Sequence, residues 1–533
     1  MRKLISVLLI CVLVIAGFAV AAHANPAAYV TYAQFGAVGD GETCDFDAII
    51  AAHAYANEHG LPVRVNAGTF YIGESGRTAI IQTSTDWTGA SFIINNTNVP
   101  AQERHAASGQ FYRYYNIFEV RSALPIVDRA AEVDALYVGM ENVGITFAQP
   151  AFIVARDQTT RHFTRPGAPD GAAMTDVFIV DEAGNVCETT PIVWDFSEVT
   201  EFFVHPIDAE TLYITGGEFN TIEAMSGRNG PFYRRGIDFQ RSNVVLDGLV
   251  HNLVNPIVPG DETGRGWGLV QIIRASGITV QNSMLAGRVG YDIFIESSAN
   301  ILFYHVEQTN CIHNRNYWGI TGTHRNKNMV FDSVALSRIG SHQGVHNLTI
   351  RNSEVGWSGI PTTGSGTLLL ENTTVSSFHL VTLRETFGSS WRGEFVIRDV
   401  VFRPTNTTDV ALFRIDNNGR NHFGFQAALP TTVCINGLVI DDAHLRTWRS
   451  RFPLLYLGPN LFSANHVYGN DALGITLLWD WLTVRRNAPY RIQITQDVSL
   501  RNVEVTSGRR LRTSRSVLEF RNTNLTWRCP CAS

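Results

Sequence analysis

Arg274, Glu296 and His324 each follow a short run of β-forming residues, and each run leads into a turn. When these runs are aligned on their turn residues, the three side chains fall at roughly equivalent positions, and His342 is a candidate for the next one. A carboxylate between a guanidinium and an imidazole stays ionised, and it raises the pKa of the imidazole. The pattern therefore predicts an acid/base cluster around Glu296 and His324.

Hydrolysis of a glycosidic bond is one reaction that such a cluster could perform, and it needs two carboxyl groups. Asp292 is a candidate on the same face, but it precedes Glu296 by four residues, about 13 Å along an extended strand. That separation is too large for an ordinary pair of catalytic carboxyl groups. A second acid would have to come from another strand or a loop, for example from Asp332, Glu307 or Asp261.

Elimination from a uronic acid needs different groups: a base for the C5 proton, a cation that neutralises the carboxylate, and an acid for the leaving oxygen. His324 or His342 can serve as the base. Three arginines can neutralise the carboxylate: Arg274, Arg325 and Arg338. Because the segment 296–346 is rich in histidine and arginine, elimination is slightly favoured over hydrolysis. For each single residue, the alternative is a solvated side chain on a polar outer face.

Aromatic residues near this segment could stack on the flat C–H faces of sugar rings, or they could pack against the fold. They are Tyr291, Tyr317, Trp318 and Trp357. We count them, together with Arg325, as candidate substrate-binding residues. Nearby acidic residues match no recognised calcium loop, and the scattered cysteines show no zinc spacing. The sequence therefore predicts no cofactor, with Ca²⁺ left open.

The elements that must position these residues are repeated. A short β segment, typically a small residue or Asn followed by β-formers and a polar pair, recurs seven times at an average step of about 25 residues, the length of one coil of a solenoid. The seven segments begin at Ser242, Ser276, Ala299, Lys327, His346, Gly366 and Gly393. Stacked coils about 4.8 Å apart would bury their inward apolar residues in a continuous core. The repeat predicts an all-β parallel β-helix.

Asparagines recur where the chain enters these strands: Asn243, Asn300, Asn328 and Asn347. Stacked Asn side chains can hydrogen-bond to one another along a column of turns, as in amide ladders. We expect these four residues to be structural.

The N-terminal part predicts a cap for this solenoid. Residues 34–73 read as a Gly-rich loop, a short helix that ends at Gly60, and a strand. Asp45 could cap the helix, and an apolar stripe that begins at Ile49 could cover the open end of the solenoid.

The same segment resembles the N-terminal signature of the pectate lyase superfamily, the pectin-lyase-like β-helix proteins. Phe35–Gly41 matches FGA-x-GDG, Asp45–Ala48 matches the acidic start of the helix, and Ala67–Phe70 matches AGT-aromatic, although Asn66 replaces the usual proline. The resemblance implies a right-handed parallel β-helix, and the superfamily includes lyases, hydrolases and non-catalytic adhesins. The catalytic motifs of polygalacturonases and of classical pectate lyases are absent.

Composition and the N-terminus indicate an exported protein. Arg2 and Lys3 precede an apolar run and a small-x-small pattern that ends at Ala24, which predicts a signal peptide over residues 1–24. The net charge of −6 becomes −8 without these two cations, which gives no footprint for nucleic acid. We expect no membrane span in the mature form, and a secreted, periplasmic or cell-surface location.

The leading hypothesis is a secreted carbohydrate-active enzyme that cleaves a polysaccharide on the β-helix face. The alternative is a non-catalytic surface protein that binds or adheres to glycan. We expect a cap and first coils over residues 25–90, β-rich coils with long loop insertions over 91–240, and the remaining coils with a C-terminal cap over 241–533, all in one continuous solenoid.

Overall fold

The computed structural model describes residues 29–74, 76–97, 116–162, 171–223, 233–254, 266–287, 291–313, 319–384, 390–405, 411–415, 428–445 and shorter segments between 451 and 526. Within these residues the chain is nearly all β, with one α-helix, α2 (Phe46–His59), and two 3-10 helices, η1 (Tyr32–Phe35) and η2 (Ala130–Glu132). No helix in this part is long and apolar enough to cross a membrane. The predicted signal peptide lies outside the described residues.

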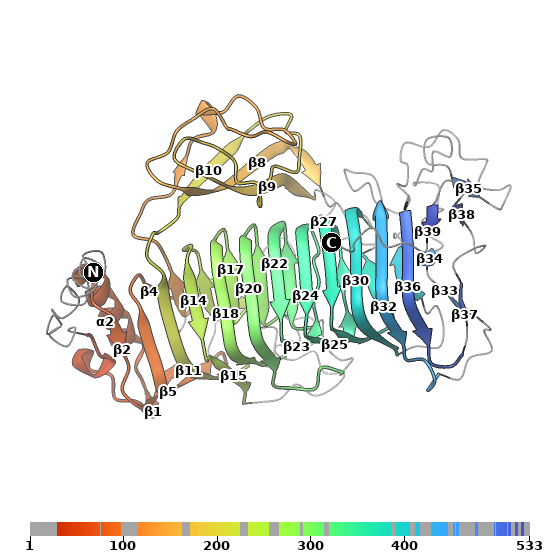
Figure 1. Ribbon diagram of the computed structural model, residues 1–533. Coiled ribbons are helices and arrows are strands. Elements are labelled where there is room, and N and C mark those ends of the chain that lie inside the picture. Colours follow the sequence, from red (N-terminus) through yellow and green to blue (C-terminus); the bar gives the residue numbers. More distant parts are fainter. Residues whose placement is uncertain are drawn as a thin grey trace, which may run out of the picture.

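Most strands belong to three parallel sheets (Figure 1). The chain alternates between the largest sheet and a six-stranded sheet as far as β21, and then between the largest sheet and a four-stranded sheet. The largest has nineteen strands: β1 (Asp40–Cys44), β2 (Val63–Arg64), β3 (Gly68–Ile72), β5 (Thr85–Asn95), β11 (Leu212–Ile222), β14 (Val244–Asp247), β15 (Val250–Leu253), β18 (Ser276–Leu285), β20 (Ala299–Gln308), β22 (Asn326–Asp332), β23 (Ala335–Arg338), β24 (Val345–Arg351), β25 (Glu354–Gly359), β27 (Gly364–Glu371), β28 (Thr374–Ser377), β30 (Trp391–Pro404), β32 (Thr432–Ile440), β36 (Asp497–Val505) and β39 (Asn524–Thr526). The second has six: β4 (Ala79–Ile81), β6 (Phe118–Val120), β13 (Ile237–Phe239), β17 (Val270–Ile273), β19 (Ile293–Glu296) and β21 (Thr321–His324). The third has four: β26 (Pro361–Thr362), β29 (His379–Leu383), β31 (Ala411–Ile415) and β34 (Leu455–Leu457).

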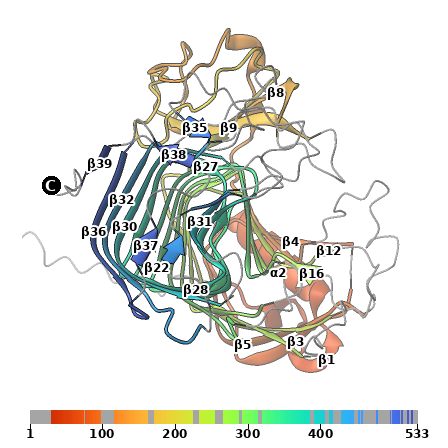
Figure 2. The same cartoon turned by 90° about the vertical axis from the view of Figure 1, so that its right-hand side faces the viewer.

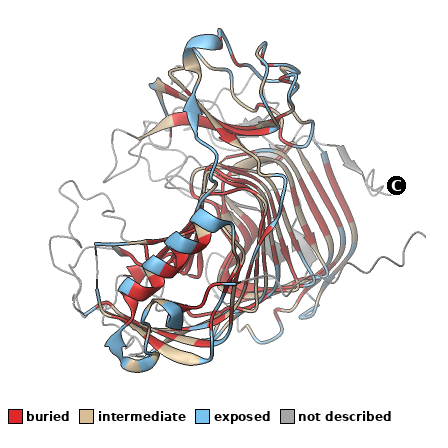
Figure 3. Ribbon diagram, turned by 90° about the vertical axis from the view of Figure 1, so that its left-hand side faces the viewer, coloured by how far each residue is buried: buried red, intermediate tan, exposed pale blue. Residues whose placement is uncertain are grey.

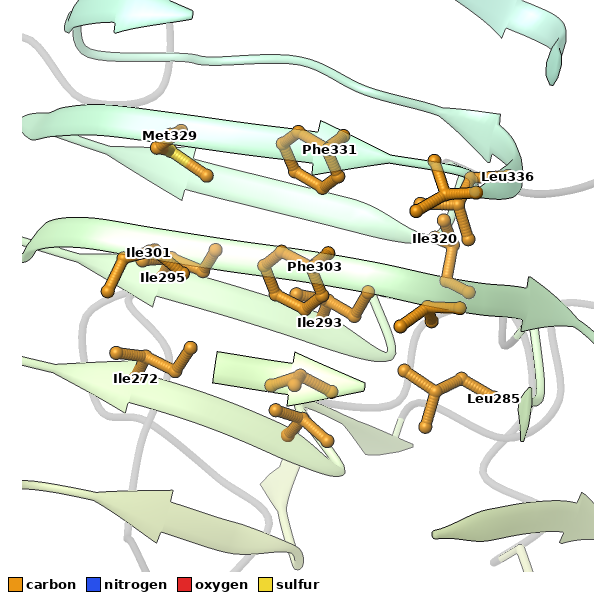
Figure 4. Close-up of a cluster of buried hydrophobic side chains, with 14 of the residues drawn as sticks. Ile272, Leu285, Ile293, Ile295, Ile301, Phe303, Ile320, Met329, Phe331 and Leu336 are labelled. Atoms are coloured by element: carbon orange, nitrogen blue, oxygen red, sulfur yellow. The ribbon is translucent and has the colours of Figure 1, made fainter. Parts of the chain in front are cut away.

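The seven repeated segments coincide with β14, β18, β20, β22, β24, β27 and β30, and each pairs in parallel with the next. The register joins equivalent inward residues, so that Ile278, Ile301, Met329 and Leu348 form one buried column. The end-on view in Figure 2 shows these coils stacked around one interior. Figure 4 shows the apolar side chains that fill it. This burial of one face of each strand holds the coils together.

The predicted asparagine ladder is present at one corner of the coil for three of the four residues, whereas Asn243 donates its amide to the carbonyl of Asp208 (2.6 Å). Asn328 Nδ2 donates to Asn300 Oδ1 (2.9 Å), and Asn347 Nδ2 donates to Asn328 Oδ1 (3.0 Å). All four asparagines have left-handed φ angles between 52° and 64°. Asn tolerates this backbone better than other residues with a side chain. Asn therefore suits this corner for two reasons: it tolerates the left-handed backbone, and its side-chain amide can hydrogen-bond to the neighbouring coils.

Helix α2 covers the first coil, as predicted (Figure 3). Its buried residues include Phe46, Ile49 and Ala52. The expectation that Asp45 caps this helix is wrong, because its side chain makes no capping hydrogen bond. Asp45 instead accepts hydrogen bonds from the amides of Val38 (2.7 Å) and Gly39 (3.2 Å), so it fixes the Gly-rich loop.

Residues 127–206, where we expected coils with long loops, contain a separate antiparallel sheet, here called the insert. It consists of β7 (Val127–Asp128), β8 (Ala151–His162), β9 (Ala172–Val180) and β10 (Glu201–Pro206). The insert has an apolar cluster of its own, and in Figure 1 it lies above the coil. A buried ion pair between Lys327 on β22 and Asp176 on β9 (2.7 Å) joins the two parts. Short strand pairs complete the description: β12 (Tyr233–Arg234) with β16 (Gly266–Trp267), β33 (Arg451–Pro453) with β37 (Arg510–Arg512), and β35 (Ile475–Leu477) with β38 (Leu518–Phe520).

Candidate functional site

The six-stranded sheet brings the predicted cluster together. Glu296 on β19 lies directly opposite His324 on β21, whereas the residue opposite Glu296 on β17 is Ile273. Arg274 is thus one position further along, and the prediction that placed it level with Glu296 is wrong by one residue. Arg274 occupies a corner with a φ of 56°, level with Ser297 (50°) and Arg325 (55°).

Glu296 is held as a carboxylate. Burial alone would raise the pKa of Glu296, but the charges of Arg325 and its other cationic neighbours outweigh burial and lower the pKa to about 2. The guanidinium of Arg325 donates directly to the Glu296 carboxylate. Arg274 contributes through its charge and is itself mostly buried. Glu296 therefore stays ionised and anchors arginines; it cannot serve as a proton donor at neutral pH.

His324 behaves differently from the prediction. Burial lowers the pKa of His324 to about 3, although Glu296 acts in the opposite direction, and the nearby arginines reinforce the lowering. The expected rise in the pKa of this histidine is wrong, because burial and positive charge together exceed the effect of one carboxylate that is already paired. His324 is a neutral imidazole.

A chain of hydrogen bonds extends from His324 to three further side chains. His324 Nε2 lies 3.0 Å from His342 Nδ1, and His342 Nε2 lies 2.8 Å from an Arg338 Nη2 atom and 2.9 Å from the Tyr291 hydroxyl. A guanidinium can only donate, so His342 Nε2 accepts and a neutral His342 carries its hydrogen on Nδ1. That hydrogen points to His324 Nε2, which leaves the His324 hydrogen on Nδ1. We call Tyr291, His324, Arg338 and His342 the tyrosine–histidine cluster.

The members of the tyrosine–histidine cluster differ in exposure. Tyr291, Arg338 and His342 are buried, whereas His324 is partly exposed. The Arg338 guanidinium lies 5.4 Å from the centroid of the Tyr291 ring, a cation–π contact. His324 is therefore the member that an approaching ligand meets first.

Two predicted residues, Asp292 and Trp357, lie outside the cluster. The prediction that Asp292 shares the face of Glu296 is wrong, because Asp292 is fully buried and pairs with His251 inside the coil. Asp292 is at the corner before β19, where the alternation of the strand does not apply. Trp357 lies on β25, in the nineteen-stranded sheet and not in the six-stranded sheet that carries Glu296 and His324. Tyr317 and Trp318 lie outside the described residues.

The insert adds groups that sequence reasoning missed. Arg156 on β8 forms an ion pair with Glu201 on β10 (3.0 Å), and its charge lowers the pKa of both Arg274 and Arg325. Three arginines from two parts of the chain thus converge near Glu296 and Glu201. No local signal marks Arg156, because its position depends on how the insert packs on the coil. This excess of positive charge suits an anionic ligand.

A pocket with an empty volume of about 580 Å³, including its opening, lies between the insert and the coil. Arg325 lines this pocket and so connects it to Glu296. Trp194 from the insert and Arg392 from β30 lie on its wall, with the guanidinium 5.4 Å from the Trp194 ring centroid. Among the described residues, no carboxylate pairs with Arg392. The pocket therefore offers one more cation to an acidic ligand.

A second polar group on the six-stranded sheet was also missed. Asp238 on β13 lies directly opposite Glu119 on β6, and both are buried. Burial raises the pKa of Asp238 to about 7, and the charge of Glu119 contributes. Two facing carboxyl groups, one of which has a raised pKa, are one arrangement used in acid/base catalysis. Within the described residues, no group of three or more His, Cys, Asp or Glu could hold a metal ion.

Comparison with known proteins defines the class by fold. The structure is similar to the tailspike gp61 of Pseudomonas phage phi297, with a TM-score of 0.50 and 12% identity over 89% of this chain and 80% of that chain. Other similar structures are the tailspike gp49 of Pseudomonas phage LKA1 (TM-score 0.46, 12% identity, 89% and 81% covered) and a family 28 exopolygalacturonase of Yersinia enterocolitica (0.27, 13%, 90% and 78%). No model of a protein family and no curated protein matches the sequence. The stacked coils and the likeness to gp61 define a parallel β-helix protein.

Proposed function

We propose that this protein is exported, has a right-handed coil, and cleaves an acidic polysaccharide by β-elimination at the tyrosine–histidine cluster. The observation that carries the proposal is the contact of His342 Nε2 with both the Tyr291 hydroxyl (2.9 Å) and the Arg338 guanidinium (2.8 Å). It supplies a proton acceptor for the phenol and a cation for the resulting phenolate.

Proton transfer would proceed in three steps. His342 Nε2 takes the phenolic proton, and the Arg338 N–H group that this nitrogen had accepted turns to the Tyr291 oxygen, where it stabilises the phenolate that forms. The Tyr291 oxygen then removes the C5 proton of a uronic acid residue, and the electron pair expels the O4 oxygen to form the C4–C5 double bond. Tyr291, protonated again, donates its proton to that leaving oxygen. The phenolate is restored while His342 stays protonated, so the pair is ready for another cycle.

The cations around Glu296 account for the preference for an acidic sugar. Removal of the C5 proton places negative charge on the substrate carboxylate, which needs donors and positive charge at short range. His324 presents its Nδ1 hydrogen, and Arg325 and Arg274 lie on the adjoining corner. These groups are held in place by Glu296 and by burial, so they need little rearrangement when charge develops.

The test is incubation with polygalacturonate, alginate, hyaluronan and chondroitin sulfate, with dextran as a neutral comparison. Absorbance of unsaturated uronate and new reducing ends are followed together. We expect both signals on an acidic polymer, and a loss of at least about 100-fold for Tyr291→Phe. Tyr304→Phe, on the exposed face of β20, is the matched control and retains activity. Reducing ends without absorbance would exclude elimination, and binding without either signal would favour the adhesin hypothesis.

Hydrolysis at Glu119 and Asp238 is the second candidate function, favoured by the pKa of about 7 for Asp238. A carboxyl group with that pKa can donate a proton to a leaving oxygen near neutral pH. In that case reducing ends form without unsaturated uronate, Asp238→Asn abolishes them, and Tyr291→Phe has no effect. The two substitutions therefore separate the two reactions.

A further inference from the structure

A second pocket lies where the chain passes between the coil and the insert. It has an empty volume of about 530 Å³ including its opening, and we call it the junction pocket. Its walls include Arg121, Ser122, Leu124 and Ile126, which lead from β6 into the insert, together with His205 on β10 and Gln240 after β13. The junction pocket does not include any residue of the tyrosine–histidine cluster. β13 and β21 are separated by three strand spacings, about 14 Å.

His205 is the unusual residue of this pocket. Its side chain is only 6% exposed, and neither ring nitrogen has a hydrogen-bond partner among the described residues. A buried polar atom without a partner is destabilising, so such atoms are normally satisfied by protein, water or ligand. His205 lines the pocket, so a molecule bound there lies against its imidazole, and a rotation of the ring would present a nitrogen to that molecule.

The charge state of His205 restricts what that molecule can be. Burial lowers the pKa of His205 to about 3, and the charges of Arg274 and Arg156 contribute. The imidazole is therefore neutral and offers one N–H donor and one bare nitrogen that can only accept. A carboxylate has no hydrogen to give to the bare nitrogen, whereas a hydroxyl group can satisfy either nitrogen.

The remaining walls also suit an uncharged, hydroxyl-bearing molecule. Arg121 is already paired with Glu119. Gln240 donates its amide to Asp238 (2.8 Å), and its carboxamide oxygen has no partner among the described residues. Leu124 and Ile126 are 40% and 50% exposed and give the pocket an apolar side. Polar groups on one side and aliphatic groups on the other match the hydroxyl edge and the C–H face of a sugar ring.

We propose that the junction pocket binds an uncharged sugar residue, with hydroxyl groups against the His205 imidazole and Gln240, and with its C–H face on Leu124 and Ile126. This site is additional to the proposed cleavage site, and it gives the protein affinity for neutral sugar residues. It does not depend on whether the tyrosine–histidine cluster is catalytic.

Calorimetric titration of the full chain tests this proposal, with methyl glucopyranoside, methyl galactopyranoside and methyl mannopyranoside as neutral probes and glucuronate as the anionic comparison. We expect one neutral glycoside to bind with a millimolar dissociation constant. His205→Phe should weaken it at least about tenfold, whereas His205→Gln, which keeps a donor and an acceptor, should stay within about threefold. Leu124→Ala should weaken binding, and Val127→Ala, an exposed neighbour that does not line the pocket, is its control.

Crystals soaked with the binding glycoside give a second readout that does not require a variant to fold. Density for the sugar against His205 and Gln240 is expected. Water alone in the pocket at saturating glycoside, equal affinity in His205→Phe and the parent protein, or tighter binding of glucuronate than of every neutral glycoside would each overturn the proposal.

Discussion

His251 Nδ1 lies 2.7 Å from Asp292 Oδ2 inside the coil, and both side chains are fully buried. The other ring nitrogen of His251 lies 3.0 Å from the Thr221 hydroxyl. This row of hydroxyl, imidazole and carboxylate resembles a catalytic arrangement, but it has no exposed surface. Its members come from β11, β15 and the corner before β19, so it links three successive coils through their interior.

Loss of Asp292 should therefore destabilise the protein. We expect Asp292→Ala to lower the free energy of unfolding by about 3–5 kcal/mol, because His251 is left buried beside a cavity without its partner. Denaturant unfolding measures the change. Arg351→Ala is the control, because Arg351 is half-exposed in its pair with Asp332 (2.7 Å), and we expect a change below about 1 kcal/mol. Equal effects of the two substitutions would show that the buried pair contributes no more to the free energy of unfolding than the half-exposed pair.

The sequence predicted those features of the fold that depend on the repeated β segments. Strands β14 to β30, the asparagine corners and the pairing of Glu296 with His324 all follow from equivalent positions in successive coils. The error of one residue at Arg274 is one of register, because Arg274 occupies the αL corner that follows the strand and is level with Ser297, not with Glu296. Asp292 was misplaced because it precedes β19 and its side chain is buried against His251.

Glu296 should make stability depend on pH in acid. Its folded pKa of about 2 lies below its ordinary value of 4.5, so its ion pairs stabilise the folded state fully above about pH 5. This contribution is lost as the pH falls from about 4.5 towards 2. Urea unfolding at several pH values should show a shallower acid dependence for Glu296→Gln than for the parent protein. Glu371→Gln, in an exposed pair with Arg398, should leave the slope unchanged.

The asparagine corner permits a separation of backbone and side-chain effects. Asn328 has a φ of 52° and takes part in amide bonds with Asn300 and Asn347. Asn328→Gly keeps the backbone but loses these bonds, and we expect a loss of about 1–3 kcal/mol. Asn328→Ala adds left-handed strain, and should cost about 1 kcal/mol more. If thermal or denaturant unfolding gives equal values for the two variants, the φ angle does not explain the choice of Asn.

The insert could not be derived from the repeat, because its contacts with the coil join residues that are far apart in the chain. Arg156 and Trp194 reach the site only because β8 and β9 pack over the corner, and neither lies in a repeated segment. The same holds for His205, whose environment combines residues before, within and after the insert. Sequence periodicity indicates which strands stack within the coil. It does not indicate how the insert packs on the coil.

The Lys327–Asp176 pair should control how firmly the insert is held. Both side chains are 2% exposed, and Asp176 also accepts hydrogen bonds from the amides of Val177 (2.8 Å) and Val193 (2.7 Å). Lys327→Met leaves a buried carboxylate, and we expect a loss of about 3–5 kcal/mol in the free energy of unfolding. The double variant Lys327→Met with Asp176→Leu should recover part of this loss, because it removes both charges.

Chemical labelling provides an independent measure of the same contact. Lysine occurs only at positions 3 and 327, so in a chain that begins at Asn25 the ε-amine of Lys327 is the sole lysine target for an amine reagent. We expect this amine to resist labelling in the native protein and to react fully in denaturant, because its reaction requires the insert to leave the coil. Asp176→Ala should accelerate labelling of the native state, and Asp332→Ala, on the outer face of the same strand, should not. Rapid labelling of the parent protein would show that the insert separates readily from the coil.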